Sequence, residues 1–433
     1  MPLSSEPKVV VLGAGLAGLS ASIELRRRGV PHRVFERASR PGGLAVTEVE
    51  AGYRFDRTGH LLHLRDADLK ADIEAWMGPG TMLEIDRKSV VWSHGVTTKY
   101  PFQANVYGLP KEVAYACVHG FVRAKLETSP RPVATFEDFC LRHFGEGISE
   151  AFMIPYNEKL WGVHPREITA AWCDRFVPIP KLEDVLRGAF GVDPPQLGYN
   201  ARFLYPRLGI GELSRVLAER AGVIELDKAA TRIDPEKREI HVGGEASAYT
   251  EIVSSLPLDT LVGLVDPAPP EVVAAAKRLR CTSLYYLDVA LNTPCEVDWH
   301  WAYVPERDVP FYRVGAYSNL SAAMAPTGKG CLYVELAGRE EPDLGRLLPV
   351  VADHLVAMGV IRAREAVRFA RVRRIDHAYV VFDEHHDEAV ARIQPWLEAR
   401  GIRSIGRYGS WTYASMEDAL LAGRDEAKRI AGA

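Results

Sequence analysis

The chain has 433 residues, enough for two or three domains with a sizeable buried core. Its 53 lysine and arginine residues against 57 aspartate and glutamate residues give a formal net charge of −4, which offers nucleic acid or acidic lipid no general attraction. Hydrophobic residues make up 47% and charged residues 25%, the balance of an ordinary globular protein rather than a disordered one.

Three features bear on the compartment. No apolar run reaches the ~18 residues that a membrane span needs. Residues 1–7 lack the basic and apolar blocks of a signal peptide. The six cysteines are dispersed without a CxxC pair, which is typical of free thiols in a reducing compartment. We therefore expect a cytoplasmic protein without a membrane span.

The N-terminal segment alternates strand and helix patterns. Residues 8–12 are a mainly apolar, β-branched run, as expected of a strand buried on both faces of a parallel sheet. Residues 13–29 then favour a turn and a helix, with arginines in the last turn, where cations suit the helix dipole. Residues 33–35 are the second strand, so the segment is predicted to be a βαβ unit.

Two different patterns follow along the chain. Amphipathic helical stretches occur first, at 113–126, 136–144 and 169–176. Strand patterns dominate afterwards, at 284–291, 302–305, 311–317, 331–336 and 367–372, with one helix at 344–358. Because turn-rich loops join these short strands, we predict an antiparallel sheet that packs one face on the core.

Two later pieces return to the first pattern. A hairpin-like stretch at 237–244 leads to a strand at 252–254, and a strand at 402–406 precedes a helix at 416–430. We therefore predict an α/β fold whose nucleotide-binding domain is discontinuous. The predicted parts are a Rossmann-like nucleotide domain (1–75, 207–262 and 375–433), a helical insertion (106–190) and an antiparallel substrate domain (76–105, 191–206 and 263–374).

A glycine motif lies where the first strand meets the first helix. Gly13-Ala14-Gly15-Leu16-Ala17-Gly18 fits G-x-G-x-x-G. In such a motif Gly13 allows the tight turn, Gly15 lets the backbone approach a pyrophosphate, and Gly18 permits close packing of helix and strand. Glu36 ends the second strand, in the position that binds a ribose hydroxyl. Together these residues predict a dinucleotide site.

The residues after this unit favour FAD over NAD. Arg37 and Arg40-Pro41-Gly42-Gly43 resemble the extension found in flavoproteins with the two-dinucleotide-binding fold, and residues 404–409 resemble their later element that closes over the ribityl chain and flavin. There is no second glycine motif of this kind for a nicotinamide. The resulting cofactor-binding set is Gly13, Gly15, Gly18, Glu36, Arg37, Gly42, Gly43, Leu44, Gly59, His60, Gly406, Arg407 and Met416.

A metal site is the alternative for one short polar stretch. His385 and His386 lie beside Asp383, Glu384 and Asp387, which are residue types that ligate metals. The stretch is more typical of a solvated loop or a helix start, and we predict no metal.

Four motifs together identify a family. They are Tyr-Pro-Phe-Gln-Ala-Asn at 100–105, Tyr-Asn-Glu-Lys-Leu-Trp-Gly at 156–162, Phe-Tyr-Arg at 311–313 and Gly-Ser-Trp-Thr-Tyr at 409–413. The chain resembles UDP-galactopyranose mutase, a flavoenzyme that interconverts the six- and five-membered ring forms of UDP-galactose. The resemblance extends over nearly the whole chain and is closest to the branch with a histidine beside the flavin, here in Thr58-Gly59-His60.

The resemblance assigns the substrate-binding residues. Flat rings suit a pyrimidine, an amide offers its edge a donor and an acceptor, and the fork of arginine suits phosphate oxygens. The resemblance places uracil and ribose on Tyr100, Phe102, Gln103, Asn157 and Trp161, the diphosphate on Arg175, Arg313, Tyr379 and Tyr413, and the sugar beside Asn200, Trp301 and Tyr303.

The resemblance also implies an unusual use of flavin. Ring contraction changes no oxidation state, and in this family N5 of reduced FAD forms an adduct with the anomeric carbon while UDP leaves and returns. The catalytic residues would be Arg175 and Arg313, which stabilise the leaving diphosphate, and His60, which acts near N5 through its backbone. The expected partners are a UDP-sugar and an external reductant such as NAD(P)H or a reductase.

Two other functions share this fold. An oxidoreductase of the amine oxidase or protoporphyrinogen oxidase type shares the N-terminal motif but gives no reason for Arg175, Arg313 and residues 100–103 together. A prenyl-protein escort of the dissociation-inhibitor type would lack flavin, against the glycines and Glu36. The residues do not distinguish galactose from related sugars or exclude a thymidine nucleotide.

Overall fold

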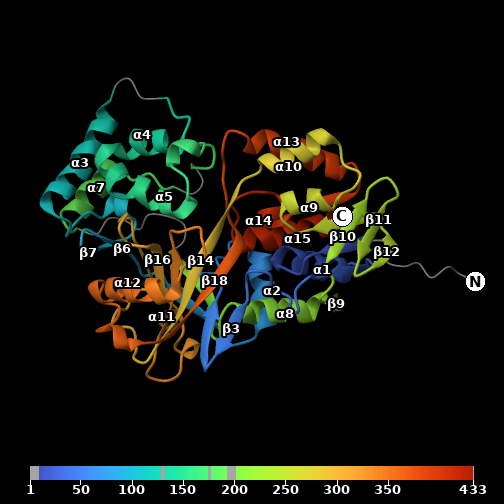
Figure 1. Ribbon diagram of the computed structural model, residues 1–433, viewed down its shortest axis with the longest axis horizontal. Helices are drawn as coiled ribbons and strands as arrows, with labels where there is room; N and C mark the ends of the chain where they lie inside the picture. Colours follow the sequence, from blue (N-terminus) through green and yellow to red (C-terminus); the bar gives the residue numbers. More distant parts are fainter. Residues whose placement is uncertain (1–8, 128–131, 174–176, 193–200, 433) are drawn as a thin grey trace, which may run out of the picture.

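The computed structural model describes residues 9–127, 132–173, 177–192 and 201–432. Figure 1 shows a group of helices at one end, a sheet with its helices at the other, and the long strands β14 (Cys281–Leu291) and β18 (Val367–Val380) running side by side between them. In the described ranges no helix is both long and apolar enough to cross a bilayer.

The nucleotide domain is built on a five-stranded parallel sheet in the order β19-β13-β1-β2-β9. The strands are β1 (Val9–Leu12), β2 (His32–Phe35), β9 (Ile224–Glu225), β13 (Glu251–Ser254) and β19 (Ile402–Ser404). Alternate residues of β1 enter different cores, Val9 and Val11 on one face and Val10 and Leu12 on the other. Because both faces are covered, β1 is apolar throughout, as predicted.

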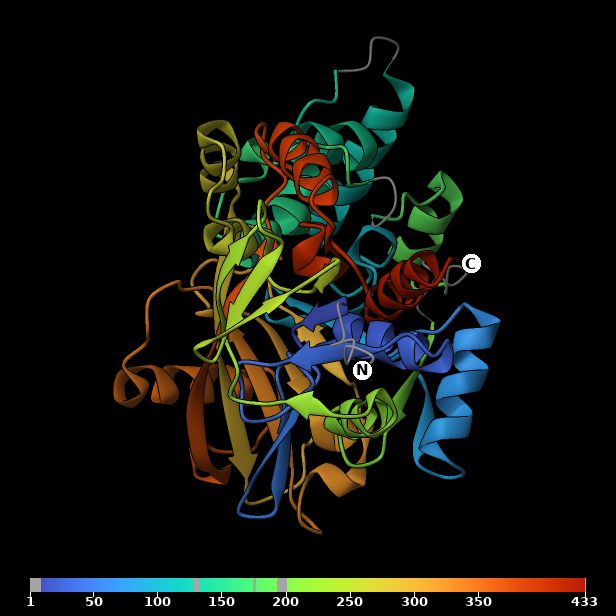
Figure 2. The same cartoon turned by 90° about the vertical axis from the view of Figure 1, so that its right-hand side faces the viewer.

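Helices cover one face of this sheet and a second sheet helps to cover the other (Figure 2). The first face carries α1 (Leu16–Arg27), α2 (Ala67–Met77), α8 (Gly211–Ala221) and α15 (Met416–Ile430). The opposite face carries the antiparallel strands β10 (Ala230–Asp234), β11 (Glu239–Val242) and β12 (Glu245–Ala248), with helices α9 (Leu258–Leu264), α10 (Pro270–Arg278) and α13 (His386–Glu398).

The helical insertion contains two helices that the periodicity did not predict, α5 and α7. Its helices are α3 (Lys111–Leu126), α4 (Phe136–Ile148), α5 (Ile154–Trp161) and α7 (Leu182–Ala189). The helix expected at 169–176 is wrong for residues 169–172, which form a bridge and a turn. The backbone N–H of Thr169 donates to Phe382 and that of Ala170 to Ala134, so these groups pair with other segments instead of forming a helix. Residues 174–176 lie outside the described residues.

The substrate domain is a seven-stranded sheet in the order β18-β14-β17-β16-β15-β6-β7. Besides β14 and β18 it contains β6 (Ser89–Ser93), β7 (Val96–Lys99), β15 (Trp301–Tyr303), β16 (Phe311–Ala316) and β17 (Cys331–Leu336). Neighbouring strands are antiparallel, as predicted, except that β15 and β6 are parallel. Since β6 comes from a distant segment, no hairpin dictates its direction. The predicted domain boundary at residue 375 falls inside β18.

The two faces of this sheet differ in polarity. Leu287, Val314 and Val334 lie on the face that packs against α12 (Leu344–Ala357). The register places Tyr303 beside Arg313, and Arg313 beside Glu335, on the opposite face. The sheet therefore has one apolar face against α12 and one polar face.

The remaining short elements connect the two sheets. They are the hairpin β3 (Thr47–Glu50) and β4 (Tyr53–Asp56), the pair β5 (Met82–Asp86) and β8 (Arg202–Pro206), and the short helices α11 (Tyr317–Leu320) and α14 (Gly406–Gly409).

The crossing of α1 and α15 gives a test of the fold. A Cβ added at Gly423 would lie 2.1 Å from the carbonyl oxygen of Ala17, whereas a Cβ at Gly263, in α9, would meet nothing within 4 Å. We expect Gly423→Ala to lower the free energy of unfolding by ~1–3 kcal/mol, because the helices must separate. Gly263→Ala should raise it by about 0.5–1 kcal/mol. Urea unfolding measures both, and a neutral Gly423→Ala would contradict the crossing.

Candidate active site

Glycines form a close-packed cradle at the end of β1. Gly13 has a φ of +88°, and a Cβ at Gly18 would lie 1.9 Å from the carbonyl oxygen of Gly13. A Cβ at Gly43 would lie 3.1 Å from the Cα of Gly15, and the N–H of Gly42 donates to the carbonyl of Ala14 at 2.8 Å. The two glycine segments predicted to hold the cofactor therefore meet, and the close approach at Gly43, where φ is +59°, favours glycine.

Glu36 lies at the mouth of this cradle. Its carboxylate accepts the backbone N–H of Ala14 at 2.7 Å and that of Ala38 at 2.9 Å. The residue is 9% exposed, and each carboxylate oxygen keeps a lone pair beyond these bonds. The arrangement suits the hydroxyls of a ribose, so the residues present fit a dinucleotide such as FAD.

A short loop after β4 carries His60. Thr58 has a φ of +68°, and the Tyr317 hydroxyl donates to the carbonyl of Asp56 at 2.6 Å, which holds the start of the loop. His60 Nδ1 is buried and has no hydrogen-bond partner among the described residues. Burial, together with the positive charges of Arg407 and Arg313, lowers the pKa of His60 to about 4, so the ring is neutral. An orphaned, neutral ring nitrogen at this point fits a site that a cofactor completes.

The later cofactor residues approach from α14 and α15. Arg407 donates to the carbonyls of Ala414 and Ala378, both at 3.1 Å, and its guanidinium lies 4.7 Å from the ring of Tyr413. A Cβ at Gly406 would lie 2.9 Å from that of Ala17, in α1. The remaining members differ in burial: Arg37 is exposed, whereas Leu44 and Met416 are half-buried against the core.

Arg313 is held on the polar face of the large sheet. Its Nε donates to one oxygen of Glu335 at 2.9 Å, and its Nη2 donates to the other at 2.6 Å and to the Tyr379 hydroxyl at 3.3 Å. Glu335 is fully buried, whereas the Arg313 side chain is 19% exposed. Nη1 makes no hydrogen bond to a described residue, so the guanidinium keeps donors for an anion.

Aromatic residues surround this arginine. The rings of Tyr100 and Tyr303 lie 5.0 Å apart, and Trp301 lies two residues before Tyr303 on the same face. Burial raises the pKa of Tyr379 to about 12, so its hydroxyl remains a neutral donor. Four predicted substrate residues therefore form a continuous chain of neighbours, in the order Tyr100, Tyr303, Arg313 and Tyr379.

The predicted uracil residues of the helical insertion lie deeper. Phe102 is 0% and Trp161 is 1% exposed, and Gln103 donates to the carbonyl of Pro178 at 3.0 Å. The Asn157 amide donates to Met153 at 2.7 Å and accepts from the Trp161 indole at 3.3 Å. Phe102 and Trp161 belong to the hydrophobic core, so both rings support this region from inside. Arg175 and Asn200 lie outside the described residues.

Sequence reasoning missed the partner of Arg313. Glu335 and Tyr333 alternate with Leu332, Val334 and Leu336 along β17. A glutamate inside such a strand was the available signal, because a buried carboxylate needs a cation. A Cβ at Gly59 would lie 2.6 Å from the Tyr333 hydroxyl, so the same strand also contacts the His60 loop.

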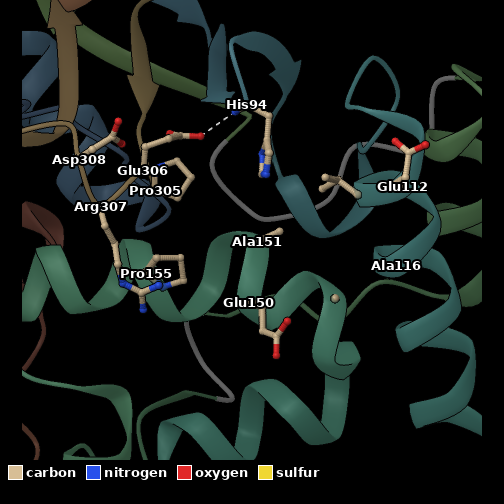
Figure 3. A pocket seen from close by; sticks show the side chains of 12 residues that line it. His94, Glu112, Ala116, Glu150, Ala151, Pro155, Pro305, Glu306, Arg307 and Asp308 are labelled. Atoms are coloured by element: carbon tan, nitrogen blue, oxygen red, sulfur yellow. Dashed lines mark hydrogen bonds between the residues drawn. The ribbon is translucent and has the colours of Figure 1, made fainter.

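Two other regions do not contribute to this site. His386 begins α13 as expected, but it is buried rather than solvated, because its ring bonds Asp387 and the carbonyl of Trp411. No group of three or more potential metal ligands occurs among the residues that the structure describes. A cavity of about 570 Å³, drawn in Figure 3, is lined by none of the predicted site residues; its polar members include His94, Glu112, Glu150, Glu306, Arg307 and Asp308.

Comparisons with known proteins bear on the nucleotide domain and on the fold. Residues 11–74 match the model of the NAD(P)-binding Rossmann-like domain. Pyridine nucleotide-disulfide oxidoreductase domain-containing protein 2 of Rattus norvegicus is 44% identical over 73 residues, which are 17% of this chain and 13% of that protein. The chain therefore matches only a small part of that relative.

Solved structures match far more of the chain. A structure of reduced UDP-galactopyranose mutase is 26% identical, with a TM-score of 0.91 over 98% of this chain and 94% of that one. Cyclohexylamine oxidase from Brevibacterium oxydans IH-35A is 15% identical, with a TM-score of 0.71 over 99% of both chains. The predicted resemblance is confirmed: the chain has a Rossmann-like flavoenzyme fold shared with the amine oxidases, and over nearly its whole length it is a structural relative of UDP-galactopyranose mutase.

Proposed function

We propose that this chain is a flavin-dependent mutase that interconverts the pyranose and furanose forms of a UDP-sugar. The observation that carries the proposal is the position of Arg313. This arginine is fixed by Glu335 and Tyr379, its Nη1 bonds none of the residues that the structure describes, and its charge acts on His60 beside the proposed FAD site. A diphosphate between these groups would bring the attached sugar close to the cofactor.

The residues around Arg313 suit a leaving group that must return. The bidentate pair with Glu335 fixes the guanidinium plane, so little rotamer freedom is lost when an anion binds. The neutral Tyr379 hydroxyl and Arg407 add polar and cationic groups on one side, and Tyr100 and Tyr303 form an aromatic wall. Arg175, Asn200, Tyr413 and Trp301 complete the proposed substrate set.

The chain's own residues would bind, orient and hold charge. FAD, when bound in its reduced form, would supply a nucleophile for the anomeric carbon. Arg313 would stabilise the negative charge that develops on the departing diphosphate and keep it in place for the return step. His60, neutral at physiological pH, would contact the cofactor through its loop without adding a charge. The reaction consumes no electrons, so an external reductant such as NAD(P)H or a reductase is needed only to activate the flavin.

The direct test is an assay of redox dependence. Purified protein is incubated anaerobically with UDP-galactose, with and without dithionite, and the sugar nucleotides are separated by chromatography. We expect both ring forms with reduced protein and no conversion with oxidised protein. An oxidised product with hydrogen peroxide, formed from an amine by the aerobic protein, would favour the oxidase function instead.

A substitution of Glu36 tests the proposed FAD site. We expect Glu36→Ala to weaken FAD retention at least ~10-fold, since hydrogen bonds to a charged group contribute about 1.5–3 kcal/mol. Glu225→Gln is a matched control at the end of the adjacent strand β9, where Glu225 pairs with Arg33. The flavin-to-protein absorbance ratio after gel filtration measures both. Full retention of FAD by Glu36→Ala, or NAD in the wild-type protein, would contradict the assignment.

A substitution of Arg313 tests the proposed diphosphate contact. Lysine keeps the charge beside Glu335 but loses the bidentate fork, so we expect Arg313→Lys to lower turnover roughly 10²-fold with unchanged FAD content. Arg373→Lys is the control, because Arg373 also donates to a buried carboxylate, that of Asp288, at 2.9 Å. Initial rates with UDP-galactose compare the two. Normal turnover in Arg313→Lys would place the diphosphate elsewhere.

A further inference from the structure

Arg339 joins two parts of the proposed site. It follows β17 by three residues and reaches the C-terminal end of α5. Its Nη2 donates to the carbonyls of Lys159 and Leu160, both at 2.8 Å, and its Nη1 donates to the carbonyl of Ser283, in β14, at 2.9 Å. One guanidinium thus bonds a helix of the insertion and a strand of the sheet.

The end of α5 is shaped to admit this side chain. Gly162 follows the helix with a φ of +68°, and a Cβ at that position would lie 2.3 Å from the Arg339 Nε. Only a glycine lets the guanidinium pass so close to the helix terminus. The N–H of Gly162 donates to Glu158 at 2.8 Å, so Arg339 and Gly162 together satisfy three of the carbonyls that end the helix.

Arg339 is held by dipoles rather than by a carboxylate. Among the described residues, no acidic side chain forms an ion pair with it, and its three hydrogen bonds all go to backbone carbonyls. A cation suits the negative end of a helix dipole. Arg339 is half-buried, and its three bonds to carbonyls of two different elements fix where those elements lie relative to each other, which points to a positional role.

A lysine also ties this helix to the sheet. Lys159 is 8% exposed and donates to the carbonyls of Val304, at 3.0 Å, and Glu306, at 2.8 Å, directly after β15. The helix that carries Asn157 and Trp161 is therefore bonded to segments next to Tyr303 and Glu335.

We propose that Arg339 is a positioning residue that sets the distance between the nucleobase end and the diphosphate end of the site. This positioning role rests on the proposed function. Glu335, which fixes Arg313, and Arg339, which fixes α5, belong to one segment of β17 and the residues after it. A rigid segment of this kind would keep a fixed distance between the proposed base site near α5 and the proposed diphosphate site at Arg313.

The test separates binding from chemistry. We expect Arg339→Gln to raise KM for UDP-galactose at least ~10-fold and to weaken uridine and UDP binding by the same factor, while kcat changes less than ~3-fold. Arg339→Lys should recover part of the affinity, since an ammonium group still donates to these carbonyls. Arg400→Gln is the control, because Arg400 also donates to a carbonyl near a helix end, that of Trp396 at 3.0 Å, far along the chain from α5. It should leave KM unchanged.

Hydrogen exchange gives an independent measurement. Amides of residues 154–162 should exchange faster in Arg339→Gln than in the wild-type protein, whatever the substrate is. Unchanged exchange there, or an unchanged KM and uridine affinity in Arg339→Gln, would overturn the positioning role. A wild-type protein that binds no UDP and converts no UDP-sugar would instead refute the proposed function, and the exchange measurement would still decide the role of Arg339.

Discussion

The buried pair of Arg313 and Glu335 is the constraint on which the candidate site depends. A glutamate with no exposed surface must be paired, and the strand register puts the only suitable fork, among the described contacts of Glu335, directly opposite it. Two parallel hydrogen bonds then leave the guanidinium one orientation. The Tyr379 hydroxyl, in β18, accepts a further hydrogen bond from the Arg313 Nη2, which also bonds Glu335. The polar face therefore presents a fixed cation whose remaining donors face away from Glu335.

The rest of the architecture brings a cofactor site to that cation. The loop after β4, which carries His60, is far from β17 in the sequence. It nevertheless contacts Tyr333, which lies two residues before Glu335 on β17. From the other side, Arg339 fixes α5 at the end of the same strand. One strand and the residues after it thus connect the cofactor loop, the proposed diphosphate site and the proposed base site.

Much of the fold could be predicted from the sequence because its signals are local. The apolar run of β1, the glycine motif and Glu36 are adjacent in the chain and encode their own geometry. The alternation in β17 also predicted a strand, but not that Glu335 would face Arg313, because register between distant strands is not written in either strand alone. The contacts of Arg339 were missed because they too join segments that are distant in the sequence. The helix expected from residue 169 does not begin there, because long-range backbone bonds to Phe382 and Ala134 outweigh local periodicity; Cys173 is the first helical residue of the predicted range.

The burial of Phe102 and Trp161 narrows the set of side chains that could contact a nucleobase. Neither ring could be called a core residue from its motif, since aromatic residues serve both purposes. With both rings buried, Tyr100, which lies beside Tyr303 and under the guanidinium of Arg87, is the better-exposed member of the predicted base pocket. The most direct test is a crystal structure of the reduced protein with UDP. The account predicts the diphosphate on Arg313 Nη1 and Tyr379, and the uracil near Tyr100. UDP bound elsewhere, such as in the acidic cavity beside His94, would contradict it.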